Sequence, residues 1–309
     1  MKIFATLVTI CLVSACSFSA SACDEKQINE TKLVMSTADG VVGGTTLEHS
    51  ARNSLVFVVI VAGSGPVDRD GRANGAANTP YFDLAHALAC RGIESFRFDK
   101  AGVGESQPTD RPGSHASLAR QIRDLQSVLH ELHTRYATRR IIVVAHSEGS
   151  LVVADQPSNG FVDGVILLSP PGPEIVNSFR HQLLSSGIDQ NSIALSEHYF
   201  DMVIRGQRFF PELGLRGYFP INSQDYLQEI MSVRLDRSLM NSGFDVSIVR
   251  GDLDTIIPLA EFSNLATNIE PVSTVHIPDM DHNLNDRSGS ISSLLVESIV
   301  KLSLEFKNE

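Results

Sequence analysis

The chain has 309 residues, of which 42% are hydrophobic and 20% charged, and its formal net charge is −11. This length and composition suit a globular protein with one large α/β domain. The acidic balance and the absence of Lys/Arg runs argue against a nucleic-acid partner, because neutralising phosphates requires clustered positive charge. We therefore expect one folded body that binds no nucleic acid.

The first 22 residues have the pattern of an export signal and not of a folded element. A short positive start precedes an apolar run over residues 3–13, which is too short to span a bilayer. Small residues follow the run, as they do before a processing site. We expect residues 1–22 to be a signal and processing region that is not part of the fold.

Two processing sites compete in this region. Residues 12–16 resemble a bacterial lipobox, which would make Cys16 the lipidated N-terminus, whereas cleavage after Ala22 would release a soluble protein that begins at Cys23. The lipobox is favoured because it directly adjoins the apolar run. We therefore expect a protein of the bacterial periplasm or cell envelope that meets the membrane only through an anchor at Cys16.

Few cysteines remain in the body of the chain. Once the signal region is set aside, only Cys23 and Cys90 are left, and Cys90 lies in an apolar helical stretch. We expect Cys90 to be a buried free thiol, and we expect no metal site because no CxxC pattern is present. Residues 23–31 are polar and are interpreted as a tether to a domain over residues 32–309.

The first part of that domain predicts three strands. Residues 32–36 and 43–48 are expected to pair antiparallel at an edge of the sheet. Residues 55–61 form a continuous β-branched run, which is typical of a central strand buried on both faces. This run ends in the loop Ala62-Gly63-Ser64-Gly65, whose glycines let the backbone approach a substrate. The alternative is a flexible loop without a role in binding.

Helices and strands then alternate. Residues 81–91 have helical spacing, residues 93–98 form the next strand, and residues 115–136 form a long amphipathic helix before a buried strand at 140–145. This order predicts a parallel sheet with right-handed crossovers.

A candidate nucleophile, Ser147, follows that buried strand directly. The segment Ala145-His146-Ser147-Glu148-Gly149 fits the G-x-S-x-G nucleophile elbow, except that Ala replaces the first Gly, and a helix follows it. A serine hydroxyl is a weak nucleophile until a base can reach it and backbone N–H groups can stabilise the oxyanion. The N–H groups of Ser64 and Glu148 are the candidate donors. The alternative is a helix N-cap serine.

The alternation stops after a strand at 161–168. Residues 173–242 are helical in pattern and rich in aromatic side chains, namely Tyr199, Phe200, Phe209, Phe210, Tyr218, Phe219 and Tyr226. We interpret this segment as a lid inserted between strands, which would supply an apolar wall over the nucleophile. The alternative is additional helical core.

The sheet resumes at residues 244–250, and two acidic residues, Asp252 and Asp254, follow this strand at its carboxyl end. His282 follows a last strand, so Ser147, Asp254 and His282 come in the chain order of the Ser–Asp–His triad of α/β-hydrolases. Asp252 is the rival acid, but its spacing from Gly251 fits the motif less well. His146, next to the nucleophile, is interpreted as a neighbour in the elbow and not as the base.

The chain from residue 32 to residue 306 resembles an α/β-hydrolase, with a mostly parallel sheet flanked by helices and an inserted helical lid. The motifs that carry this resemblance are residues 62–71, 98–104 and 146–149, and they are similar to those of a bacterial subgroup of carboxylesterases.

Two residues depart from that subgroup: Ala145 in the elbow, and Ala101, where Arg is usual. The second departure concerns substrate contacts more than the triad.

The resemblance implies a serine carboxylesterase that hydrolyses small, short-chain acyl esters through an acyl-enzyme and needs no cofactor. Related members act on peptides and thioesters, so a serine aminopeptidase or an acyl thioesterase is the alternative. A non-catalytic, lipid-anchored binding protein is disfavoured because all three triad positions are occupied.

Overall fold

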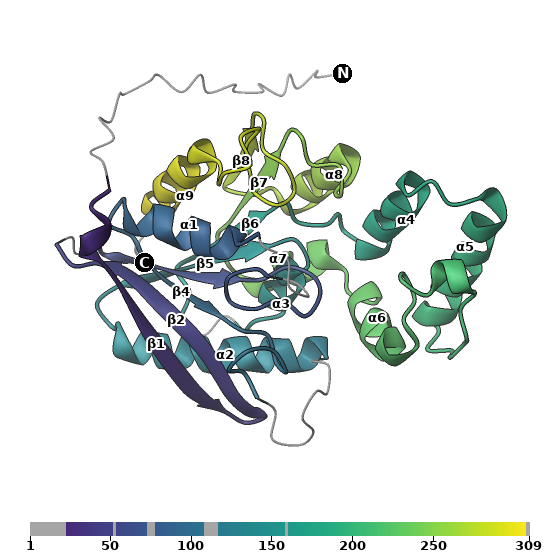
Figure 1. Cartoon of the computed structure of the whole chain (residues 1–309), viewed down its shortest axis with the longest axis horizontal. Coiled ribbons are helices and arrows are strands. Elements are labelled where there is room, and N and C mark those ends of the chain that lie inside the picture. The colour runs from purple at the N-terminus through teal and green to yellow at the C-terminus, as the bar shows by residue number, and fades with distance from the viewer. Residues whose placement is uncertain (1–22, 52–53, 73–77, 108–116, 158–159, 307–309) are drawn as a thin grey trace, which may run out of the picture.

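A single mixed β-sheet forms the centre of the computed structural model (Figure 1). The structure describes residues 23–306 apart from 52–53, 73–77, 108–116 and 158–159. The expected signal region, with Cys16 and Ala22, therefore lies outside the described residues. Among the described helices, none is long and apolar enough to cross a membrane.

The strands are β1 (Ile28–Thr37), β2 (Gly40–His49), β3 (Val56–Val61), β4 (Glu94–Phe98), β5 (Arg140–His146), β6 (Gly164–Leu168), β7 (Val246–Gly251) and β8 (Ser273–Ile277). The helices of the body are α1 (Pro80–Ala89), α2 (Leu118–Arg135), α3 (Gly149–Ala154), α7 (Leu235–Ser242), α8 (Leu259–Ile269) and α9 (Ser293–Glu305). In the described part of the chain the eight strands lie in the order β1-β2-β4-β3-β5-β6-β7-β8. β1 and β2 pair antiparallel at one edge, and β3 to β8 run parallel to one another. The predicted fold class is confirmed.

Alternation along the central strands explains why helices cover both faces of the sheet. In β3, Phe57, Val59 and Val61 pack into one core while their neighbours Val56, Val58 and Ile60 pack into another. The first core lies under α2 and α3, and the second lies under α1 and α9 (Figure 1). All six side chains are almost completely buried, as expected for a strand between two helical layers.

Three further helices, α4 (Ile175–Ser185), α5 (Gln190–Ile204) and α6 (Gln224–Met231), lie between β6 and α7 and project from the body (Figure 1). Stacked and edge-on aromatic rings join this projection internally, among them Tyr199, Phe209 and Phe219. α7 instead packs against α3 and α8, within the body. The segment that projects is thus shorter than residues 173–242, and its role as a lid stays a prediction.

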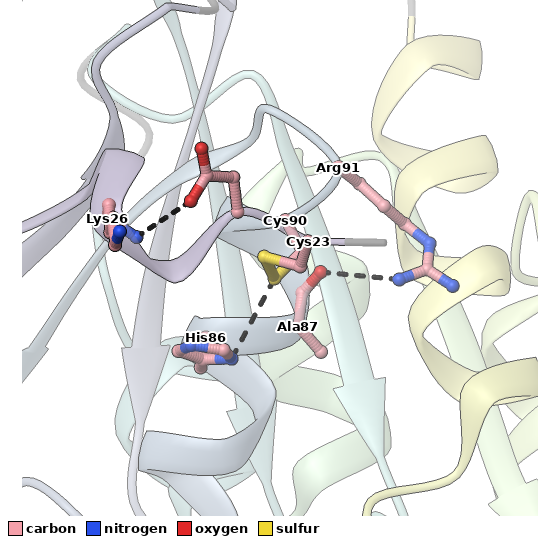
Figure 2. Close-up of a disulfide and its surroundings, with 7 residues drawn as sticks. Cys23, Lys26, His86, Ala87, Cys90 and Arg91 are labelled. Atoms are coloured by element: carbon pink, nitrogen blue, oxygen red, sulfur yellow. Dashed lines mark hydrogen bonds between the residues drawn. A yellow bond between two sulfur atoms is a disulfide. The ribbon is translucent and has the colours of Figure 1, made fainter. Parts of the chain in front are cut away.

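The N-terminal segment is attached to the body by a disulfide between Cys23 and Cys90 (Figure 2). The expectation of a free Cys90 thiol is wrong, because Cys90 is the C-cap of α1 and its Cα lies 5.2 Å from that of Cys23. β1 begins at Ile28, inside the segment that we interpreted as a tether, and pairs with β2. Residues 23–31 are therefore held at one end by the disulfide and at the other by the sheet.

Removing this disulfide is expected to destabilise the fold. It joins residues 67 apart in sequence, and closing a loop of that length in the unfolded chain contributes about 4 kcal/mol in the chain-entropy model. The double variant Cys23→Ser/Cys90→Ser should therefore lose about 2–4 kcal/mol of unfolding free energy in urea titrations. Reduced wild-type protein is the matched control and should behave like the variant. An unchanged unfolding midpoint in both would contradict the disulfide.

Candidate active site

Ser147 stands at the turn between β5 and α3 in a backbone conformation that is rare for a residue with a side chain. Its φ angle is 51°, in the left-handed region. The Ser147 N–H donates to the Leu168 carbonyl at the end of β6, at 2.9 Å, which holds the turn against the sheet. Strained residues of this kind are concentrated at functional sites.

Small residues make this turn possible. A Cβ atom on Gly149 would lie 2.7 Å from the Ala62 carbonyl oxygen, so only glycine allows α3 to approach the end of β3 this closely. Ala145, which replaces the usual first glycine of the elbow, is fully buried and packs in the core under α3. The departure from the sequence pattern is therefore accommodated by packing.

Asp254 and His282 form a hydrogen-bonded pair. His282 Nδ1 lies 2.9 Å from Asp254 Oδ2, and Asp254 is 4% exposed. The other carboxylate oxygen accepts from the N–H groups of Ile256 and Ile257. Burial raises the pKa of Asp254, but the hydrogen bond and charge of His282 and the backbone donors outweigh it, so the pKa falls below its usual value. An ionised Asp254 holds a proton on His282 Nδ1 and leaves Nε2 free to accept one.

The rival acid, Asp252, points elsewhere. Its Oδ1 atom lies 3.5 Å from Nδ1 of His276 in β8, and the Asp252 side chain is 52% exposed. The structure therefore brings Asp254, and not Asp252, to His282.

The base lies beside the elbow. The rings of His146 and His282 have centroids 4.9 Å apart, and His146 Nε2 lies 2.9 Å from the His282 carbonyl oxygen. Among the described residues, Ser147 Oγ makes no hydrogen bond to His282, and this contact is often long before substrate binds. Ser147, His282 and Asp254 thus all lie at the carboxyl ends of the parallel strands.

The two candidate oxyanion donors, Ser64 and Glu148, belong to segments that lie beside or adjoin Ser147. A Cβ on Gly63 would lie 3.3 Å from Ser147 Cβ, so the loop after β3 passes directly beside the nucleophile. The Gly63 N–H is occupied by the Tyr81 hydroxyl. Within the described part of the chain, the N–H groups of Ser64 and Glu148 donate to no other group, which leaves both available to a ligand.

A second set of contacts, which the sequence did not reveal, surrounds the Glu148 side chain. Lys100 Nζ lies 3.3 Å from Glu148 Oε1, and the Tyr226 hydroxyl makes a short hydrogen bond to the same oxygen. Gln121 donates to the Tyr226 oxygen at 3.0 Å. Burial and the charge of Glu148 raise the pKa of Tyr226, which stays protonated as a donor. Helix α6 is thereby fastened to the residue that follows the nucleophile.

One group of potential metal ligands is present among the described residues. The ligand atoms of Cys23, His86 and Cys90 all lie within 4.8 Å of one another (Figure 2). Both sulfur atoms are used by the disulfide. This group lies at the far end of α1 from Tyr81 and does not belong to the Ser147 site.

Comparison with known proteins agrees with this geometry. Residues 75–184 match the family described as serine aminopeptidase, S33. The esterase EstD of Thermotoga maritima is 26% identical over 147 residues, which cover 48% of this chain and 34% of EstD. The chain thus spans about a third of the length of this curated relative.

Solved structures show the same fold. A serine hydrolase homologue from Coxiella burnetii has a TM-score of 0.55 at 17% identity, and the match covers 88% of this chain and 96% of that one. An esterase from Pyrococcus furiosus has a TM-score of 0.60 at 15% identity, covering 90% and 91% respectively.

The two acidic residues after β7 should differ strongly in their contribution to turnover. Asp254→Asn should lower kcat on p-nitrophenyl acetate by on the order of 10⁴, because the amide would favour the wrong His282 tautomer. Asp252→Asn, the matched control, should change kcat less than about twofold, because the Asp252 side chain is half exposed and lies beside His276. The reverse ranking would transfer the role to Asp252.

Proposed function

We propose that the chain is a serine hydrolase of the α/β-hydrolase superfamily and, within it, a carboxylesterase that acts on small, short-chain acyl esters. The observation that chiefly supports this proposal is the buried Asp254–His282 pair beside the strained Ser147. The esterase relatives from Thermotoga maritima and Pyrococcus furiosus point in the same direction.

The proposed reaction uses an acyl-enzyme. Ser147 Oγ attacks the ester carbonyl carbon while His282 Nε2 takes the hydroxyl proton, and the N–H groups of Ser64 and Glu148 donate to the oxyanion. His282 then protonates the leaving alkoxide as the ester C–O bond breaks. A water molecule, deprotonated by His282, hydrolyses the acyl-enzyme and regenerates Ser147. Asp254 stays ionised throughout and stabilises the charged imidazolium.

The surroundings of the elbow favour an ester over a peptide with a free N-terminus. An aminopeptidase needs an available carboxylate to bind the substrate's α-ammonium group. Glu148, the buried carboxylate of the elbow itself, is already paired with Lys100 and hydrogen-bonded by Tyr226. Peptide hydrolysis remains the alternative because the matched family is described as serine aminopeptidase, and thioester hydrolysis is possible by the same chemistry.

We also propose export, with lipidation at Cys16. The Cys23–Cys90 disulfide supports export, because disulfides persist in oxidising compartments such as the bacterial periplasm. The disulfide uses Cys23 and Cys90, and of the two cysteines that remain, Cys11 and Cys16, it is Cys16 that ends the lipobox-like segment.

A substrate series tests the proposed reaction. Purified wild-type protein should hydrolyse p-nitrophenyl esters with the highest kcat/KM at two to four acyl carbons, and should turn over aminoacyl p-nitroanilides and acyl-CoA at least about 100-fold more slowly. Ser147→Ala is the blank for each substrate. Preference for an aminoacyl anilide with a free amino group would replace the esterase proposal with an aminopeptidase.

A fractionation experiment tests the anchor. Wild-type protein should sediment with membranes and dissolve in detergent, because several acyl chains together give stable anchoring. Cys16→Ser should move the protein to the soluble fraction or leave it as precursor, with unchanged kcat for the extracted enzyme. A soluble wild-type protein whose N-terminus is Cys23 would contradict the anchor and leave export standing.

A further inference from the structure

Two buried side chains that the proposed reaction does not use, Tyr81 and His146, form a continuous hydrogen-bond chain. The Gly63 N–H donates to Tyr81 Oη at 2.7 Å, and Tyr81 Oη lies 2.9 Å from His146 Nδ1. His146 Nε2 lies 2.9 Å from the His282 carbonyl oxygen. Tyr81 is 4% and His146 7% exposed. The chain therefore runs through the interior and links the loop after β3, the elbow and the loop after β8.

The direction of every hydrogen bond in this chain is fixed. The His282 carbonyl can only accept, so His146 carries its proton on Nε2. Nδ1 of the neutral ring must then accept, so the Tyr81 hydroxyl donates to Nδ1 and its oxygen accepts from Gly63. No member can reverse its role without leaving a buried polar group unpaired.

The protonation states suit these roles. Burial and the neighbouring His282 lower the pKa of His146 to about 3, so its ring is neutral at any pH where an esterase works. Burial raises the pKa of Tyr81, which keeps its donor proton. Both His146 nitrogens are engaged in hydrogen bonds, to Tyr81 and to the His282 carbonyl, so His146 is not an alternative general base.

We propose that Tyr81 and His146 are positioning residues that set the His282 main chain and the oxyanion loop, which is the loop after β3 that carries Gly63 and Ser64, relative to Ser147. The hydrogen-bond chain begins at Gly63, which precedes Ser64, and ends at the main chain of the candidate base His282. His146, within the hydrogen-bond chain, precedes Ser147. Tyr81 can serve as a fixed point because it lies in the first turn of α1, directly after Pro80, in a helix packed on the sheet. This inference rests on the proposed esterase function.

The size of the expected effect follows from geometry. Displacing catalytic groups by about 1 Å can cost on the order of 100-fold in rate, while binding energy made elsewhere on the substrate is kept. Loss of this hydrogen-bond chain should therefore lower kcat and leave KM nearly unchanged. A role in packing alone would lower stability without changing turnover per folded molecule.

Tyr81→Phe is the direct test, because it removes only the hydroxyl. We expect kcat on p-nitrophenyl acetate, normalised to active sites titrated with a fluorophosphonate, to fall about 10- to 100-fold with KM within about twofold of wild type. Tyr136→Phe is the matched control: Tyr136 is half-buried, and its ring stacks on Phe57 near the start of β3, at the opposite end of that strand from the loop that carries Ser64. This control should keep wild-type kcat.

His146→Asn provides a second test should Tyr81→Phe fold poorly. The shorter amide can still accept from Tyr81 but cannot reach the His282 carbonyl, and it should lower kcat by a similar factor. In the double variant the two fold-losses in kcat should not multiply, because both substitutions break the same hydrogen-bond chain. Wild-type kcat in folded Tyr81→Phe or His146→Asn overturns the positioning role while the esterase assignment stands. Absence of ester turnover in wild-type protein would instead defeat the proposed function.

Discussion

The hydrogen bond between Asp254 and His282 is the interaction on which the proposed chemistry depends. A carboxylate that is 4% exposed is costly to ionise, and here the imidazole N–H and the backbone N–H groups of Ile256 and Ile257 offset that cost. Removing one partner from such a buried pair typically costs about 3–5 kcal/mol. The same bond fixes the His282 tautomer, so the stability of the loop after β7 and the basicity of His282 Nε2 have one physical origin.

The parallel sheet explains how the candidate triad residues, which are far apart in sequence, come to lie close together. The carboxyl ends of four parallel strands, β3, β5, β7 and β8, lie on the same side of the molecule. One part of the site follows each of them, namely the oxyanion loop, Ser147, Asp254 and His282. A buried ion pair fixes the neighbouring loops. Arg69 Nη2 lies 2.5 Å from Asp99 Oδ2, and the same carboxylate accepts from the Arg69 and Glu105 N–H groups. Burial raises the pKa of Asp99, but these donors outweigh it and hold the pKa below its usual value. The motif residues around 68–71 and 98–104 therefore hold the loops beside the site, and Lys100 among them contacts Glu148.

Strand-end position and local spacing are the sequence signals that predict the candidate triad. The elbow predicts Ser147, and the distance from Gly251 favours Asp254 over Asp252; among the described residues Asp254 is hydrogen-bonded to His282, whereas Asp252 lies beside His276. The disulfide was missed because Cys23 and Cys90 are 67 residues apart and form no spacing pattern. Tyr81, Gln121 and Tyr226 were missed for a related reason: each acts through a hydrogen bond to a residue far away in sequence, and a helical tyrosine alone predicts only core packing. The charged residue directly after the nucleophile, Glu148, was the one signal that could have prompted a search for partners.

An activated Ser147 should react with a fluorophosphonate, and mass spectrometry of the intact protein and of its peptides detects the product. We expect a single adduct per wild-type molecule, located on the peptide that contains Ser147, and no adduct on Ser147→Ala under the same conditions. An unlabelled wild-type protein, or an equal adduct on Ser147→Ala, would show that Ser147 is not the nucleophile.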